Sequence, residues 1–308
     1  MARYLVTGGA GFIGSHLCAR LVADGHDVRA LDDLSSGHRS NLDGVDVDLI
    51  VGDLRDSDAL GSAVEGADFV LHHAAIASVQ YSVEHPLEEQ DVNVVGTLQV
   101  LEAARAAGVR RVVFAASAAA YGADEKVPKQ ETMPTVPISP YGLSKVAGEH
   151  YCRGWSHVYE LETVCLRYFN IFGPRQDPAS PYSGVISIFA RAMIDGRTPT
   201  IHGDGEQSRD FTFVDNVVAA NMLACAMPST AGEIYNIGCA RAITVNELVA
   251  ALNTCLGSEL KPDHIESRAG DVRVSLADIS AASQQLGYEP TTAFEEGLRQ
   301  TVDWMRAS

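Results

Sequence analysis

Residues 8–14 read GGAGFIG, and this glycine-rich stretch decides the fold of the chain. The residues before it, Arg3 to Thr7, form a short apolar run typical of a buried strand, and Phe12 to Ala23 has the pattern of a helix. A glycine-rich turn from strand to helix lets the backbone turn tightly, and the helix N-terminus offers N–H groups and positive dipole to a pyrophosphate. The turn therefore predicts a dinucleotide site, formed by Gly8, Gly11, Phe12, Ile13 and Gly14.

A carboxylate stands at the end of the next predicted strand. Asp32 lies eighteen residues beyond the last glycine of the turn, where an acidic side chain accepts hydrogen bonds from the adenosine ribose and repels a 2′-phosphate. The pattern favours NAD over NADP, with Asp33 as the neighbour that could take this role instead. After the third strand, Asp53 and Leu54 are expected to contact the adenine ring, unless Asp53 only caps the next turn.

Strand-like and helix-like segments alternate through the first half of the chain. Strands are expected at 3–7, 27–31, 47–51, 68–72 and 109–115, and helices at 12–23, 87–107, 186–195, 215–226, 245–256 and 294–305. This alternation predicts an α/β fold, a Rossmann-type doubly wound parallel sheet with a smaller C-terminal α/β substrate-binding lobe. We expect an NAD-binding domain over residues 1–166 and the substrate-binding lobe over 167–308, partly interleaved with the first.

Composition excludes several classes of partner. The net charge of −17 argues against nucleic acid and anionic membrane surfaces, which need a basic face. No apolar run approaches the eighteen residues needed to cross a bilayer, and the start of the chain lacks an export signal, so a cytoplasmic protein is expected. The six cysteines and ten histidines lack metal-ligand spacing, which predicts free thiols and no metal.

Three side chains in the middle of the chain have the pattern of a proton-transfer site. Tyr141 and Lys145 are four residues apart on a predicted helix that Ser139 can cap, so both project from one face. A phenol with a pKa near ~10 becomes a base at neutral pH only where positive charge stabilises the phenolate, and Lys145 supplies such charge. Ser117, at the end of the fifth strand, can hydrogen-bond the reacting oxygen and relay its proton to Tyr141.

These motifs together resemble the extended short-chain dehydrogenase/reductase family, and within it they are most similar to UDP-hexose 4-epimerases. The resemblance extends from Tyr4 to about Tyr288 and also includes RYFNIFGPR (167–175) and GEQSRDFTFVDN (205–216). It implies that Tyr141 takes a proton from the sugar 4-OH while tightly bound NAD takes the hydride. A transient 4-keto sugar then turns over and is reduced on its other face.

The resemblance also implies binding roles and an assembly. Asn93 and Tyr168 are expected beside the cofactor, with Tyr141 and Lys145. Asn170, Arg209 and Arg268 are expected to hold the uridine diphosphate of a UDP-sugar. The helices Leu87 to Ala107 and Ser144 to Trp155 are candidates for a homodimer interface, although internal packing would give the same periodicity.

The residues after Ser117 and near residue 275 bear on the reaction and the sugar. Relatives that dehydrate or decarboxylate sugars carry acidic residues after the serine, whereas this chain has Ala118 and Ala119. Ser275 corresponds to the position beside the sugar C2 substituent, where a small residue leaves space for an N-acetyl group. We therefore expect UDP-GlcNAc/UDP-GalNAc as substrates, with UDP-Glc/UDP-Gal as further substrates.

Other functions stay open on the sequence. A UDP-glucuronate 4-epimerase needs no acidic residue at 118 or 119. An NAD(P)-dependent sugar-nucleotide reductase is disfavoured by Asp32, and a non-catalytic dinucleotide sensor by the intact set of Tyr141, Lys145 and Ser117.

Overall fold

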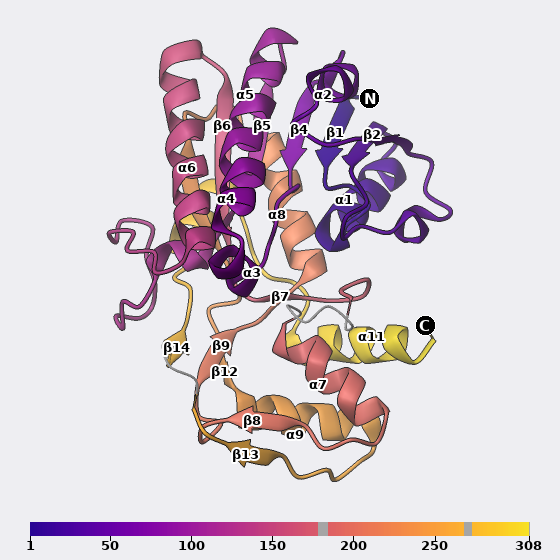
Figure 1. The fold of residues 1–308 in the computed structure, drawn as a ribbon, viewed down its shortest axis with the longest axis vertical. Coiled ribbons are helices and arrows are strands. Elements are labelled where there is room, and N and C mark those ends of the chain that lie inside the picture. Colours follow the sequence, from indigo (N-terminus) through magenta and orange to yellow (C-terminus); the bar gives the residue numbers. More distant parts are fainter. Residues whose placement is uncertain (178–183, 268–272, 308) are drawn as a thin grey trace.

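A seven-stranded parallel sheet forms the centre of the larger lobe (Figure 1). The computed structural model describes residues 1–177, 184–267 and 273–307. In spatial order the strands are β11 (Glu233–Ile237), β6 (Glu162–Tyr168), β5 (Arg111–Ser117), β4 (Phe69–His72), β1 (Arg3–Thr7), β2 (Asp27–Asp32) and β3 (Asp48–Val51). The order reverses between β1 and β4, and ligands of such sheets bind beyond the carboxyl ends of the strands at that switch point.

Helices cover both faces of this sheet. One face packs against α1 (Phe12–Ala23), α8 (Val214–Ala226) and α10 (Ser280–Leu286) through buried residues such as Leu17 and Val217. The other face packs against α2 (Ser57–Val64), α5 (Gly96–Ala106) and α6 (Pro140–Tyr159), with Leu60 and Leu101 in its core. The sheet is therefore doubly wound, as predicted.

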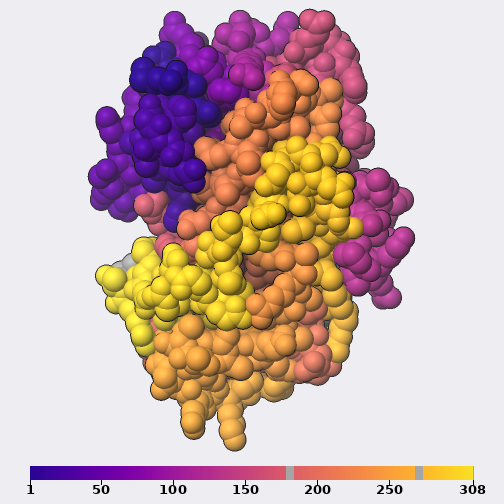
Figure 2. Space-filling view, turned by 180° about the vertical axis from the view of Figure 1, so that it is seen from behind, coloured from indigo at the N-terminus to yellow at the C-terminus, as the bar shows by residue number. Residues whose placement is uncertain are grey.

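The smaller lobe consists of short strands and three longer helices. Its strands are β7 (Ile171–Phe172) with β10 (Thr212–Phe213), β8 (Thr200–His202) with β13 (Asp263–Ile265), and β9 (Ser208–Asp210) between β12 (Ala242–Thr244) and β14 (Val274–Ser275). The helices α7 (Val185–Ile194), α9 (Val245–Leu256) and α11 (Phe294–Ala307) enclose a separate apolar core. In Figure 2 the yellow C-terminal segment lies against both lobes.

Two strands of the main sheet, β6 and β11, were not predicted from the sequence. β6 spans the expected domain boundary at 166/167, and β11 returns to the sheet from the second half of the chain. The pattern of β6 is masked by Arg167, a buried charge whose partner is Glu149 on α6, 2.7 Å away. A buried arginine is tolerated in a strand only where such a partner exists, and a local sequence pattern does not reveal it.

The predicted helix at 87–107 is interrupted. The structure divides it into α4 (Pro86–Gln90), a wide π-type turn (Asp91–Val95) and α5, after the short helix α3 (Val79–Glu84). The turn contains Asn93, whose side-chain amide bonds both backbone groups of Ile76, 2.8 and 3.1 Å away. Wide turns of this type are frequent at functional sites.

Candidate active site

The glycine-rich turn forms a tight cradle at the carboxyl end of β1. Gly8 has a φ of +69°, and its N–H donates to the Leu31 carbonyl 2.8 Å away. A Cβ on Gly14 would lie 2.0 Å from the Gly8 carbonyl oxygen, so only glycine allows the helix to pack on the turn at this place. At Gly11, by contrast, an added Cβ would meet only the Gly8 oxygen, at 3.1 Å. Gly11 thus faces open space where a phosphate can approach, and Phe12 and Ile13 begin the helix beside it.

Asp32 lies at the end of β2, beside this cradle. Its side chain is largely buried and accepts from the backbone N–H groups of Ala10 (2.9 Å) and Leu34 (2.8 Å). Burial raises the pKa of Asp32, while those two N–H groups act in the opposite direction. Gly37 lies over the carboxylate, since a Cβ there would come within 2.8 Å of it. The sequence reading did not single out Gly37, although its place five residues after Asp32 is a usable signal.

The residues expected near the adenine have partners of their own. Asp53 forms an ion pair with Arg55, which also binds Asp91, each at 2.5 Å. Leu54 is buried against the start of α5, because a Cβ on Gly96 would lie 1.9 Å from it. The side chains of Asp53 and Leu54 therefore fix the segment after β3, and a contact with adenine stays a prediction.

Tyr141, Lys145 and Ser117 lie together at the carboxyl end of β5. Ser139 caps α6 by accepting from the Gly142 N–H at 3.1 Å, and Pro140 occupies the first turn, as predicted. The Lys145 ammonium is 5.8 Å from the centre of the Tyr141 ring and donates to the Ala115 carbonyl at 2.9 Å.

The electrostatics of this cluster depend on burial. Burial raises the pKa of Tyr141, and a hydrogen bond with the Ser117 hydroxyl lowers it in part. Burial also lowers the pKa of Lys145 to about 8, against the field of Glu89. The lowering of the Tyr141 pKa that we expected from Lys145 therefore does not arise in the chain alone, because burial of the phenol is the largest influence on its pKa.

His72, His73 and Tyr168 lie at the carboxyl ends of β4 and β6. His72 bridges the hydroxyls of Thr7 (2.7 Å) and Thr97 (3.0 Å), and His73 pairs with the Tyr168 hydroxyl at 2.9 Å. Burial lowers the pKa of both histidines to about 3, so they are neutral and serve to position their neighbours. Tyr168 thus lies at the carboxyl end of β6, directly paired with Ser117 in the β5–β6 register.

The residues expected to hold the sugar nucleotide gather around β9. Asn170 follows β6 and donates from its amide to the Asp210 carbonyl at 3.1 Å. Arg209 and Ser275 are direct register partners in the β9–β14 pair. Arg268 lies outside the described residues.

Asp210 is a residue of this region that the sequence reading missed. Its buried carboxylate accepts from the N–H groups of Cys239 (2.7 Å) and Ala277 (3.1 Å), and burial raises its pKa to about 6. Asp210 therefore fixes the strand that carries Arg209. The only signal was its place inside the GEQSRDFTFVDN motif.

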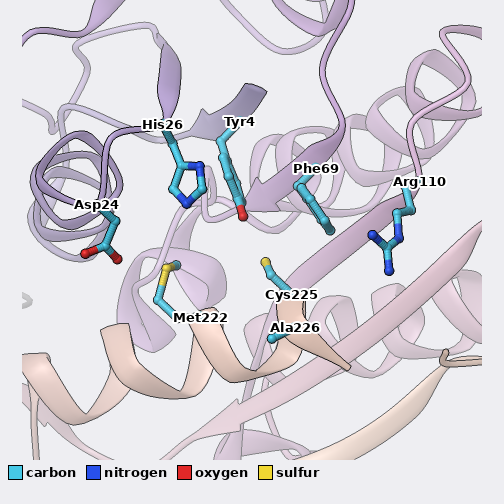
Figure 3. Close-up of a pocket in the computed structure, with 8 residues that line it drawn as sticks. All are labelled: Tyr4, Asp24, His26, Phe69, Arg110, Met222, Cys225 and Ala226. Carbon is cyan, nitrogen blue, oxygen red and sulfur yellow. The ribbon is translucent and has the colours of Figure 1, made fainter. Parts of the chain in front are cut away.

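A separate hollow of about 340 Å³ lies at the opposite ends of the strands, near their amino ends (Figure 3). It is lined by Tyr4, Asp24, His26, Phe69, Arg110, Met222, Cys225 and Ala226. Tyr4 and Phe69 stand near the amino ends of β1 and β4, whereas the catalytic candidates stand at carboxyl ends. The hollow is therefore not part of the candidate active site.

The arrangement fits a bound dinucleotide. Three groups of residues line the carboxyl ends of the strands. They are the cradle of Gly8, Gly11 and Gly14, the buried Asp32 at the end of β2, and the neutral pair of His73 and Tyr168. Among the described residues, no cluster of histidine, cysteine or acidic side chains has the geometry of a metal site. In the same residues, none of the helices has the length and apolarity required to cross a bilayer.

Comparison with known proteins agrees with this geometry. The model of the NAD dependent epimerase/dehydratase family matches residues 4–238, and the chain belongs to this family. The chain is 42% identical over 310 residues to a UDP-glucose 4-epimerase of Mycolicibacterium smegmatis, covering 99% of this chain and 98% of that protein.

Solved structures are similar over the full length. A UDP-N-acetylglucosamine 4-epimerase from Methanobrevibacter ruminantium, in complex with UDP-N-acetylmuramic acid, has a TM-score of 0.95 at 38% identity, covering 99% of this chain and 98% of that one. A UDP-glucose 4-epimerase from Thermus thermophilus in complex with NAD has a TM-score of 0.90 at 37% identity, covering 99% of both chains. The predicted family, fold class and cofactor type are thereby confirmed.

Proposed function

We propose that the chain is a UDP-sugar 4-epimerase that uses NAD. The observation that carries this conclusion is the cluster of Ser117, Tyr141 and Lys145, which lies at the carboxyl ends of the strands, as the glycine cradle does. When bound, NAD supplies the hydride acceptor and donor, and its positive ring adds charge near the phenol. The glycine cradle, Asp32, Asn93 and Tyr168 would hold it, with residues 1–166 as the main cofactor-binding part and Tyr168 contributed from the interleaved second part.

The side chains of the cluster have distinct roles in proton transfer. Tyr141 takes and returns the proton of the sugar 4-OH, and Ser117 hydrogen-bonds the same oxygen and the phenol. Lys145 holds its ammonium beside the phenol, where, together with the positive ring of bound NAD, it would favour the phenolate. Ala118 and Ala119, which follow Ser117 directly, carry no acid or base, which argues against dehydration or decarboxylation.

The sugar specificity is proposed from the β9–β14 pair. We place the uridine diphosphate on Asn170, Arg209 and Arg268, since an arginine matches the geometry of phosphate. Ser275, paired with Arg209, leaves space for an N-acetyl group at C2. The preferred substrates are then UDP-GlcNAc and UDP-GalNAc, with the non-acetylated pair also accepted. UDP-glucuronate is the alternative, because glucuronate 4-epimerases are also among the relatives, for example one from Thermodesulfobacterium geofontis at 31% identity.

A substrate panel tests the function and its specificity. The purified protein, with no cofactor added, is incubated with each UDP-sugar, and products are identified by chromatography and mass spectrometry. Epimers of the N-acetylated pair are expected. Turnover of UDP-glucuronate alone would favour the alternative, and net consumption of added reduced cofactor would replace the epimerase with a reductase.

An exposed apolar surface supports a homodimer. Its residues lie on α3, α4, the π-type turn and α6, elements that pack against one another: Val79, Val83, Leu87, Val95 and Leu143. Leu87 is 86% exposed, and exposed apolar patches of this kind mark interfaces. Sedimentation velocity should show a dimer, and Leu87→Glu should shift it toward monomer. A monomeric wild-type protein would rule out the interface.

A further inference from the structure

Glu89 is a fully buried carboxylate that the mechanism above does not use. It lies on α4 with an exposed fraction of 0%, whereas Glu88 beside it is exposed. Its oxygens accept from the Ser144 hydroxyl (2.6 Å), the Gln90 amide (2.7 Å) and the Asn93 amide. All three partners are neutral donors. An ionised carboxylate only accepts hydrogen bonds, and burying one is costly unless such donors hold it.

The hydrogen bonds of Glu89 lead directly to the catalytic helix. Ser144 stands on α6 between Tyr141 and Lys145, and its hydroxyl also lies 2.9 Å from the Tyr141 carbonyl oxygen. Asn93 extends the network to the backbone of Ile76, in the segment that follows β4. Glu89 therefore connects the turn of α6 that carries Tyr141 and Lys145 with the segment that follows β4.

Glu89 differs from the other buried carboxylate near α6 in the charge of its partners. Glu149 is neutralised by Arg167 through two bonds of 2.7 Å, whereas the partners of Glu89 carry no charge. The field of Glu89 raises the pKa of both Lys145 and Tyr141.

Other titratable groups face the same pair of residues. They are His72 and His73 from the end of β4, and Glu149 and Cys152 from α6. The histidines stay neutral above a pH of about 4, since burial lowers the pKa of each to about 3. Among the described residues, Glu89 is therefore the carboxylate of this hydrogen-bond network whose bonded partners are all neutral.

We propose that Glu89 is a positioning residue of the epimerase site: through Ser144 its buried carboxylate fixes the α6 turn that bears Tyr141 and Lys145, and it acts electrostatically on that pair. This inference rests on the proposed function for its kinetic consequence, although its electrostatic consequence can be measured without turnover.

The first experiment titrates Lys145 directly by NMR. The chain has only four lysines, Lys126, Lys129, Lys145 and Lys261, so labelling with ¹³C-lysine gives a spectrum in which Lys145→Arg identifies the Lys145 signal. In Glu89→Gln, which keeps the size and loses the charge, the Lys145 midpoint should move to lower pH. Glu89→Asp, whose charge is withdrawn by one methylene, should move it less in the same direction. The matched control Glu88→Gln should leave it in place.

The second experiment records kcat/KM against pH for the same variants, as purified with their bound cofactor. Because Glu89 raises the pKa of both Tyr141 and Lys145, its loss should move the acid limb and the alkaline limb together to lower pH. The ratio of kcat/KM at pH 6 to that at pH 9 should rise about threefold or more. A residue that served only packing would lower the whole profile without displacing it.

The outcomes separate this inference from the proposed function. An inactive wild-type protein would overturn the epimerase assignment and leave the NMR titration to decide the role of Glu89. An active wild-type protein whose Lys145 midpoint and pH profile are unmoved in Glu89→Gln would overturn the inference alone. If Glu89→Gln does not fold, Glu89→Asp is decisive: no displacement, or one to higher pH, rejects the role.

Discussion

On the cofactor side of the site, Gly8, Asp32 and Ser117 lie at the ends of strands in one continuous seven-stranded sheet. On the proposed sugar side, Arg209 and Ser275 lie on strands of three and two residues that belong to a separate small sheet. The first group is fixed by two packed faces of helices, whereas the second depends on a few contacts such as those of Asp210. The difference indicates that the chemistry is built into the fold, while the choice of sugar can vary without altering the sheet.

The largest effect is expected on the cofactor side, at the phenol. Tyr141→Phe removes the proton acceptor and keeps the ring, so kcat should fall about a thousandfold. NAD released on denaturation should remain near the wild-type amount. Tyr151→Phe, on the same helix but packed against Trp155, is the control and should keep its activity. Undiminished epimerisation by Tyr141→Phe would remove the chemical basis of this side.

The next effect is expected on the sugar side and should be selective. Ser275→Tyr fills the space assigned to the N-acetyl group, so kcat/KM for UDP-GlcNAc should fall about a hundredfold. The value for UDP-glucose, measured in parallel, should stay within about threefold and serves as the internal control. Equal losses for both sugars would mean that residue 275 does not contact the C2 substituent.

Stability should respond strongly to a change in the cradle. Gly14→Ala forces a Cβ toward the Gly8 oxygen and should lower the free energy of unfolding by about 3 kcal/mol, with less NAD retained. The control is Gly61→Ala in α2, where an added Cβ meets nothing within 4 Å. That change should raise the free energy of unfolding by about 0.5–1 kcal/mol. Urea unfolding of both variants measures the difference, and equal stabilities would contradict the close packing.

The smallest effect separates the two sides by pH. Lys145 has its pKa lowered to about 8, so it is protonated and active below that pH and loses its proton above it. We expect kcat to decline toward tenfold per pH unit on the alkaline side. KM should change little, because the proposed contacts with the diphosphate come from guanidinium groups, which do not titrate in this pH range. A profile whose alkaline loss lies entirely in KM would assign the titration to the sugar side instead.

The sequence predicted several helices of both lobes well because their signals are local. The bounds of α1 and α9 were predicted to the residue, and α9 begins with a capping box between Thr244 and Glu247. The cap and first turn of α6 were read from Ser139 and Pro140. Such signals lie within a few residues of the structure they specify.

The features that escaped prediction depend on partners far away in the chain. The charge in β6 is compatible with a buried strand only because Glu149 pairs with Arg167, and β11 is a strand only because β6 offers it an edge. Asp210 acts through backbone groups of residues 239 and 277. The raised pKa of Tyr141 likewise reflects burial, which follows from the assembled fold and not from the spacing of Tyr141 and Lys145.

The late arrival of β11 has a consequence for synthesis of the protein. Residues 233–237 supply one of the two edge strands of the main sheet. The buried Arg111 of β5 bonds the carbonyls of Ala224, Cys225 and Met227 at the end of α8. While the ribosome has produced only the first two hundred or so residues, the β6 edge is bare and that guanidinium lacks these acceptors. A nascent chain at this stage exposes an unpaired, aggregation-prone strand edge. Chaperones would therefore be needed most in the interval before residue 237 emerges.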